Sequence, residues 1–174
     1  MSSTGSSRGN PAIGDIIRSM VVIAVIILAL YGFGRLFTST PETSVDPIDY
    51  ATVVAQARPA ATFALAAPPT LPEGWKATSA RFEPNGWHLG VLTDDEEYVG
   101  LEQLKGSVDR AVDRFAEDSK ADGTAVVGNQ TWSVRTGPKG RLTYVRAEDG
   151  LTTLVNTSAP RSVLEDYIAS LSTS

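Results

Sequence analysis

The pattern of apolar and polar positions divides this chain of 174 residues into two different parts. Residues 19–34 carry no charged side chain and are mostly apolar, and the apolar character extends over residues 16–37. A helix of that length is about 33 Å long at ~1.5 Å per residue, which matches a bilayer core of ~30 Å. From residue 48 onward the apolar positions recur at the periods of strands and one-sided helices. The pattern therefore predicts one membrane span followed by one globular domain.

A cleaved signal peptide and a buried soluble helix are the alternatives for residues 16–37. A signal peptide has an apolar region of roughly 7–15 residues that is followed at once by small residues at a cleavage site. Here the apolar run is longer and ends in Arg35, Leu36 and Phe37. A buried soluble helix usually keeps a polar stripe, which this segment lacks. The uncleaved span is therefore the preferred interpretation.

The charges on either side of the predicted span indicate its orientation. Arg8 and Arg18 precede most of the apolar run, whereas acidic residues dominate the segment after it. The positive-inside rule then places the N-terminus in the cytoplasm and the domain on the other side of the plasma membrane. We expect a disordered cytoplasmic tail at residues 1–15, a polar tether at residues 38–47 and an extracytoplasmic domain at residues 48–174.

The first half of this domain favours strands. An Asn85-Gly86 turn separates two stretches of alternating apolar and polar residues, as in a β-hairpin. Residues 49–56 form a short helix or strand, whereas the alanine-rich residues 57–67 are ambiguous by periodicity. The three predicted strands cover residues 75–83, 87–93 and 98–104.

The second half predicts two one-sided helices around a second group of strands. Residues 107–120 carry an apolar stripe and begin with a serine that can cap a helix. A last helix at residues 160–172 has Ser162 and Glu165 at capping-box spacing. Four further strands are predicted at residues 124–127, 130–136, 141–148 and 151–156. We therefore predict an α+β domain, in which a mostly antiparallel sheet has its helices packed on one face.

Composition narrows the classes of function. The residues after position 40 carry 12 Lys and Arg against 19 Asp and Glu. An acidic domain is a poor partner for phosphate backbones, so we expect no nucleic acid to bind. The absence of cysteine excludes disulfides, thiolate catalysis and cysteine zinc sites. A domain outside the cytoplasm without disulfides is ordinary in bacteria.

His88 is the single histidine of the chain and the first candidate for acid–base chemistry. It alternates with Trp87 and Leu89, so it faces away from their side of the predicted strand. One histidine cannot form a histidine metal cluster, and no serine near it has the context of a nucleophile elbow. The acidic residues 94–97 lack the spacing of a calcium loop. We predict no catalytic residue, no metal ligand and no cofactor.

Aromatic and polar residues of the predicted strands either line a groove beside the sheet or belong to its core. Glu102 is a possible carboxylate partner of His88 if their strands are neighbours. The candidate groove for a ligand or a partner comprises Trp87, His88, Tyr98, Glu102, Gln103 and Trp132.

Several short motifs in a fixed order resemble a known family. They are Asp49-Tyr50, Pro69-x-Leu71-Pro72-x-Gly74-Trp75, Trp87-His88-Leu89-Gly90, Tyr98-Val99-x-Leu101-Glu102-Gln103, and Gly128 followed by Trp132. Together with the apolar run before them, they resemble an actinobacterial membrane-anchored family, domain of unknown function 4245. The resemblance covers the span and nearly all of the outer domain, and it implies an envelope protein with one N-terminal span. It implies no reaction, ligand or catalytic residue.

We therefore expect a membrane-tethered, non-enzymatic module of the bacterial cell envelope that binds a protein or a ligand. The alternative is a carrier or sensor of lipid or another small ligand, with Trp87 and Tyr98 as walls of its groove. That alternative predicts a sizeable apolar pocket. A third hypothesis is a hydrolase that uses His88 with Glu102 or another acid. It requires His88 in a cleft, within hydrogen-bond reach of a carboxylate or a hydroxyl group.

Overall fold

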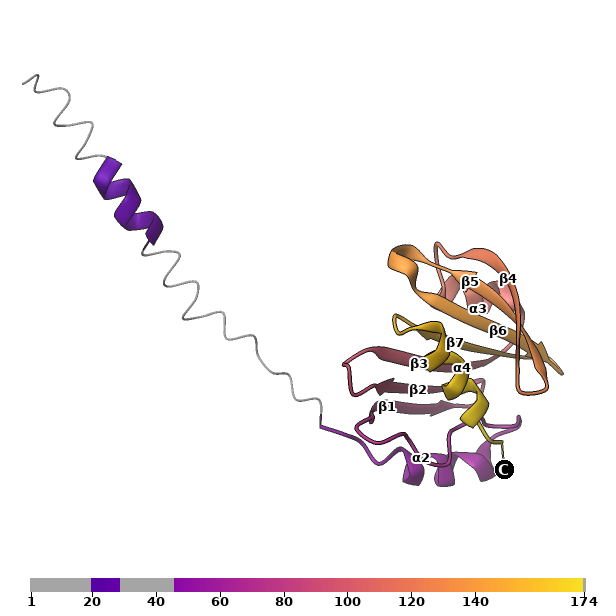
Figure 1. Ribbon diagram of the computed structural model, residues 1–174. Coiled ribbons are helices and arrows are strands. Elements are labelled where there is room, and N and C mark those ends of the chain that lie inside the picture. The colour runs from indigo at the N-terminus through magenta and orange to yellow at the C-terminus, as the bar shows by residue number, and fades with distance from the viewer. Residues whose placement is uncertain (1–19, 29–45, 174) are drawn as a thin grey trace, which may run out of the picture. The chain divides into compact units, whose positions relative to one another are not determined.

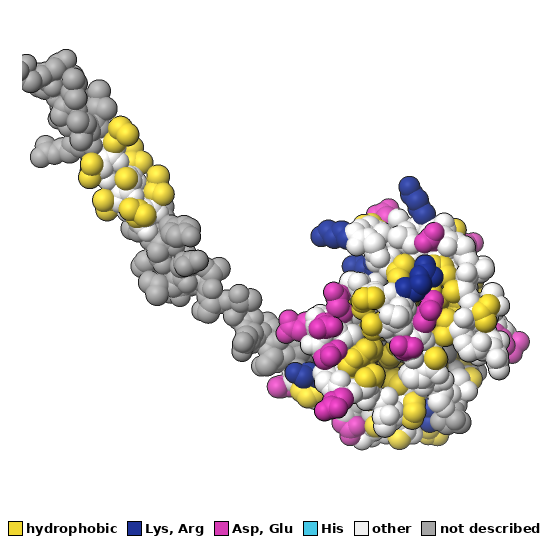
Figure 2. All heavy atoms as spheres, viewed as in Figure 1, with side chains coloured by type: hydrophobic (Ala, Val, Ile, Leu, Met, Phe, Trp, Pro, Cys, Tyr) yellow, Lys and Arg dark blue, Asp and Glu magenta, His cyan; other side chains and the backbone are white. Residues whose placement is uncertain are grey.

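The computed structural model describes residues 20–28 and 46–173, which belong to two separate compact units. Residues 20–28 are helical, and their apolar side chains are exposed (Figures 1 and 2). No helix within these two described ranges is long and apolar enough to cross a membrane. The predicted span at residues 16–37 lies mostly outside the described residues. The same holds for the predicted tail at residues 1–15 and most of the tether at residues 38–47.

A seven-stranded antiparallel sheet forms the centre of the second unit (Figure 1). The strands lie in the order β1-β2-β3-β7-β6-β5-β4, so that two meanders join where β3 pairs with β7. This arrangement confirms the predicted α+β class and its mostly antiparallel sheet. The strands are β1 (Lys76–Glu83), β2 (Gly86–Leu92), β3 (Tyr98–Lys105), β4 (Lys120–Val127), β5 (Gln130–Thr136), β6 (Leu142–Glu148) and β7 (Leu151–Thr157).

Three α-helices and two short 3-10 helices accompany the sheet. The segment for which the sequence allowed either a helix or a strand is a helix, and Asp49 caps it by accepting a hydrogen bond from the Thr52 amide at 3.2 Å. Hydrogen bonds from Thr52 lower the pKa of Asp49. The helices are α2 (Tyr50–Ala57), η1 (Arg58–Ala60), α3 (Val108–Phe115), η2 (Pro138–Gly140) and α4 (Arg161–Ser170).

One face of the sheet, here called the α4 face, holds the larger core. Trp87 and Leu89 of β2 lie on it, fully buried with side chains of α2 and α4. The hydroxyl group of Tyr144 in β6 donates to Glu165 of α4 at 2.6 Å and accepts from Arg161 at 2.7 Å. Burial and the hydrogen bond to Glu165 raise the pKa of Tyr144 to about 12. These contacts attach α4 to the middle of the sheet.

The prediction that all helices pack on one face is wrong, because α3 covers the opposite side, here called the α3 face. Ala111 of α3 packs there with Val145 and Leu154, whose chain neighbours Tyr144 and Val155 belong to the core of the α4 face. Consecutive apolar residues in a strand indicate burial on both of its faces. The pairs Tyr144-Val145 and Leu154-Val155 therefore require a cover on each side of the sheet.

One predicted helix boundary and one predicted helix cap are also wrong. The helix expected at residues 107–120 ends at Phe115, and Lys120 already pairs with Thr136 in the sheet. From Lys120 onward the backbone groups pair with β5 and so make sheet hydrogen bonds in place of the helical ones that the sequence pattern predicted. The last helix has Pro160 at its N-cap position and no side-chain cap, so the predicted capping box does not form.

Replacing Leu154 with alanine tests the cover that α3 provides. Leu154 is fully buried, so Leu154→Ala is expected to lower the free energy of unfolding by about 2–5 kcal/mol, measured by urea denaturation. Val126→Ala is the matched control, because the Val126 side chain is 71% exposed, and a change within about 0.5 kcal/mol is expected. Equal effects of the two substitutions would contradict a buried α3 face.

Candidate functional site

The second meander consists of the hairpins β4–β5 and β6–β7. A cleft opens on the α4 face where these two hairpins diverge. The pairing of β5 with β6 stops at Ser133 and Val145, whereas β4–β5 pairing continues to Gln130 and β6–β7 pairing continues to Leu151. Beyond Ser133 the β5 strand no longer follows β6. The space bounded by β5, by the β6–β7 hairpin and by the irregular segment around Ala64, which crosses the sheet, forms a cleft of about 450 Å³.

Gln103 and Trp87 fix one wall of this cleft. The amide oxygen of Gln103 accepts from the Ala66 amide at 2.7 Å, and its nitrogen donates to the Ala64 carbonyl at 3.1 Å. The indole nitrogen of Trp87 donates to the Ala66 carbonyl at 2.9 Å. Both side chains are buried, so these bonds satisfy polar groups that burial would otherwise leave unpaired. The irregular segment around Ala64 is therefore held firmly across the sheet.

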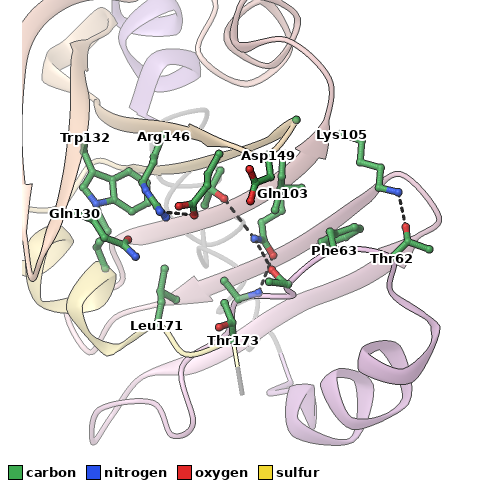
Figure 3. A pocket seen from close by; sticks show the side chains of 17 residues that line it. Thr62, Phe63, Gln103, Lys105, Gln130, Trp132, Arg146, Asp149, Leu171 and Thr173 are labelled. Atoms are coloured by element: carbon green, nitrogen blue, oxygen red, sulfur yellow. Dashed lines mark hydrogen bonds and ion pairs between the residues drawn. The ribbon is translucent and has the colours of Figure 1, made fainter.

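The lining of the cleft is amphiphilic. Trp132 and Gln130 lie at one end of the cleft and Phe63 lies with Lys105 at the other, with Gln103 between them (Figure 3). The lysine ammonium group donates to the Thr62 hydroxyl group, and Arg146 pairs with Glu148 at the hairpin end. The apolar lining consists of Phe63, Ala64, Trp132, Leu151, Ile168 and Leu171.

The indole N–H of Trp132 is the one polar group of the cleft lining in the described residues that is buried without a hydrogen-bond partner. The residue is only 2% exposed. A buried donor without an acceptor costs about 1–3 kcal/mol. Because the nitrogen atom itself is buried, a ligand would have to displace part of the lining to place an acceptor group against it and remove that cost. The adjacent Arg146 guanidinium would strengthen the attraction for such a group.

The six predicted groove residues do not form one groove, because they alternate between the two faces of the sheet, although four of them (Trp87, His88, Glu102 and Gln103) contribute to a hollow of about 210 Å³. Gln103 and Trp132 line the cleft on the α4 face, and Trp87 lies in the core beneath it. Neighbouring positions of one strand point to opposite faces, so His88 and Glu102 belong to the α3 face, as Tyr98 does. A sizeable pocket is present, but its lining is as polar as it is apolar, unlike the apolar pocket expected for a carrier, and Trp87 and Tyr98 are not its walls.

His88 and Glu102 do meet, as cross-strand partners on the α3 face. The Nδ1 atom of His88 lies 2.5 Å from a Glu102 carboxylate oxygen, and its Nε2 atom lies 2.8 Å from Ser79 Oγ. The Glu102 side chain is 10% exposed, whereas that of His88 is 25% exposed. His88 therefore has both kinds of hydrogen-bond partner named for a hydrolase. The cleft that the hypothesis also requires corresponds to the hollow of about 210 Å³, which His88 and Glu102 line but Ser79 does not.

Sequence reasoning missed Ser79 because a β-bulge changes the side to which it points. Ala77 pairs with Val91 and Ser79 pairs with Gly90, which leaves Thr78 as an extra residue in β1. A bulge shifts the alternation of side chains by one position, so the residues after it point to the opposite face from the one that strict alternation predicts. Strict alternation would have placed Ser79 with Ala77 on the α4 face, and no glycine or proline in β1 signals the bulge.

Tyr98 lies across two glycines of the same face. A Cβ atom would lie 3.1 Å from its ring at Gly90 and 3.0 Å at Gly100, so these cross-strand partners need to be glycine for the ring to approach. Burial and the Glu102 charge raise the pKa of Tyr98. Its hydroxyl group therefore keeps its proton at neutral pH and can donate a hydrogen bond.

Metal ligands do not converge in the part of the chain that the structure describes. No three His, Asp or Glu side chains there are placed to hold an ion. The acidic residues 94–97 form a turn after β2, in which Glu96 has a φ of 61°.

Comparison with known proteins identifies a family but no characterised relative. No curated protein matches the chain. A family model described as "Protein of unknown function (DUF4245)" matches residues 8–171, which is nearly the whole sequence. This match confirms the family resemblance that the short motifs indicated. The chain therefore belongs to the DUF4245 family.

Proposed function

We propose that this protein is a membrane-tethered module of the cell envelope that binds a small amphiphilic ligand in the cleft of the α4 face. The sequence favours a binding module for a protein or a ligand. The cleft supports the ligand, because small-molecule sites are typically pockets of roughly 300–1,000 Å³ that combine apolar surface with polar groups. Polar and apolar side chains line this cleft in similar proportion, which suits an amphiphilic ligand better than a purely apolar one. Its volume of about 450 Å³ falls in this range.

The observation that carries this proposal is the buried, unpaired indole N–H of Trp132 in the lining of the cleft. A core that served stability alone would gain from a partner for this donor or from its replacement by an apolar group. A bound molecule that accepts a hydrogen bond supplies the partner. Trp132 is thus a recognition residue in this proposal.

The charges of the cleft narrow the class of ligand. Arg146 and Lys105 supply positive charge, and Glu148 and Asp149 supply negative charge at the rim. This mixture disfavours a ligand with several phosphates, which a purely basic pocket would attract more strongly. An apolar body beside Phe63 and one acceptor-bearing head near Trp132 and Arg146 fit the lining. No histidine, serine or cysteine lines the cleft within the described residues, which favours binding over turnover at this site.

The proposal that the domain is tethered to a membrane rests on the apolar residues 16–37 and on the charges around them. Their length and their lack of internal charge suit a span, and the acidic segment that follows suits the outer side of the membrane. The second unit has its own sheet and core, so it can act outside the membrane on a tether.

Filling the cleft should abolish ligand binding without unfolding the domain. Ala64 lines the cleft and is exposed, so Ala64→Trp places an indole ring in the cavity without displacing a core side chain. We expect residues 45–174 to bind 1-anilinonaphthalene-8-sulfonate, a probe with an apolar body and an anionic head, at one saturable site. Ala64→Trp should weaken that binding at least about tenfold, equivalent to 1.4 kcal/mol, in a fluorescence titration.

Ala169→Trp is the matched control, because Ala169 is exposed on α4 and does not line the cleft. It should bind the probe as the unmodified domain does. Equal urea midpoints for all three proteins would show that each is folded. Probe binding that is unchanged by Ala64→Trp would remove the cleft as the ligand site.

The proposed tether is tested by fractionation and protease accessibility. The full chain should sediment with membranes and resist extraction by alkaline carbonate, whereas a chain that begins at residue 45 should not sediment. Protease added outside intact spheroplasts should digest the domain, because the charge bias places it there. Release of the full chain by carbonate, or protection of the domain until the cells are lysed, would overturn this part of the proposal.

A further inference from the structure

We propose that Ser79, His88 and Glu102 form an acyl-transfer site on the α3 face, which hydrolyses carboxylic esters. This site goes beyond the ligand-binding cleft, because its residues project from the opposite face of the sheet. It also departs from the expectation of a non-enzymatic module, which was formed without Ser79. The proposal rests on one continuous chain of hydrogen bonds from a hydroxyl group through an imidazole to a carboxylate.

The chain of hydrogen bonds fixes the role of each ring nitrogen of His88. The Glu102 carboxylate can only accept, so the proton of the neutral imidazole resides on Nδ1. The Nε2 atom then carries a lone pair and accepts from the Ser79 hydroxyl group at 2.8 Å. A base within hydrogen-bond reach of a nucleophile, oriented by a third group, is the arrangement that activates serine for attack on acyl groups.

The carboxylate at the inner end of the chain is more deeply buried than the imidazole. The Glu102 side chain is 10% exposed and that of His88 is 25% exposed. Ser79 is partly exposed on β1, which is the outermost strand at its end of the sheet. A substrate can therefore reach the hydroxyl group, while Glu102 is held in place to act as a positioning residue for His88.

Tyr98 supplies a donor next to the nucleophile. A Cβ atom at Gly90 would lie within 3 Å of both Ser79 Oγ and the Tyr98 hydroxyl group. The two groups therefore lie close together above Gly90 and fill the space there, so a substrate carbonyl has to approach them from their solvent-exposed side. In that approach the carbonyl oxygen would accept from Tyr98 while Ser79 attacks the carbon atom, since tyrosine hydroxyl groups can serve as donors to the oxyanion of such intermediates. A side chain at Gly90 would displace both groups.

The proposed reaction converts an ester and water to a carboxylic acid and an alcohol. Ser79 Oγ bonds to the acyl carbon as its proton passes to His88 Nε2, and the ester C–O bond breaks as His88 returns that proton to the leaving oxygen. Water then loses a proton to His88 and attacks the acyl-serine. The acid leaves, and the proton returns to Ser79. Tyr98 donates to the carbonyl oxygen in both steps.

The small hollow of about 210 Å³ adjoins His88 and Glu102 between β1, β2, β3 and α3. Leu104 and Phe115 supply apolar surface to it, and Arg81 and Arg114 supply positive charge. Ser79 and Tyr98 do not line this hollow, so it does not define the size of the acyl group.

The test combines an active-site label with ester turnover on the purified full chain. A fluorophosphonate probe reacts with activated serines, and peptide mass spectrometry should locate it at Ser79. Hydrolysis of p-nitrophenyl acetate should fall at least about 100-fold in Ser79→Ala and in His88→Asn, the size of effect that removing a nucleophile or general base produces. Ser162→Ala is the control, because Ser162 is exposed on α4, and its hydrolysis rate and labelling should not change.

The rate of labelling at Ser79 tests whether Glu102 positions His88 for the reaction or only stabilises the fold. Glu102→Gln should slow labelling at least about tenfold, and Glu102→Asp should recover part of the loss, while thermal melts show both proteins folded. A folded wild-type protein whose Ser79 is not labelled, or whose turnover equals that of Ser79→Ala, would overturn the proposal. Binding of 1-anilinonaphthalene-8-sulfonate in the cleft of the α4 face is measured separately with Ala64→Trp, so failure of one site does not decide the other.

Discussion

β3 and β7 are about fifty residues apart in the sequence, and their antiparallel pairing joins the two meanders into one sheet. Seven residue pairs hold this junction, from Val99 with Thr157 to Lys105 with Leu151. Gln103 adds a side-chain bond to Thr153 at 3.4 Å, and the Thr157 hydroxyl group donates to the Tyr98 carbonyl at 2.8 Å. Without this pairing, neither the cleft nor the helix cover of either face would have a continuous floor.

Two neighbouring residues of β3 connect this junction to both candidate sites. Gln103 points to the α4 face, where it fixes the segment that forms one wall of the cleft. Glu102 points to the α3 face, where it holds the ring of His88. Each is buried, and each makes a specific hydrogen bond, so each costs little as a buried polar group. The same dipeptide thus places different chemistry on opposite sides of one sheet.

The sequence predicted the strands well because their signals are local. Asn85-Gly86 and Asp149-Gly150 mark two hairpin turns, and strict alternation in β2 placed Trp87 in the core and His88 on the other side. The second helix-covered face could have been inferred from the paired apolar residues of β6 and β7. The bulge before Ser79 carries no such signal, because its cause is the pairing of β1 with β2.

The cleft could not be predicted either, because its lining residues come from segments that only the fold brings together. Phe63 lies in the alanine-rich stretch that periodicity left ambiguous, and Leu171 follows the last helix. Trp132 was identified as a candidate, although nothing in the sequence shows that its indole N–H lacks a partner. The proposed recognition role of Trp132 rests on that unpaired atom together with its place in the lining of the cleft, since Tyr167 in the core also has an unpaired hydroxyl group.

The register of β3 decides which of its side chains lie on each face of the sheet, in addition to setting its backbone hydrogen bonds. Side chains alternate with a period of two, so a slip of one residue would exchange the faces of Glu102 and Gln103. A carboxylate would then face the Ala64 carbonyl, an acceptor against an acceptor, and His88 would lose its charged partner. The Tyr98 ring opposes such a slip, because it fits closely only where glycines stand opposite each other at positions 90 and 100. The glycine pair therefore protects the chemistry of both faces by fixing which residue of β3 lies on each.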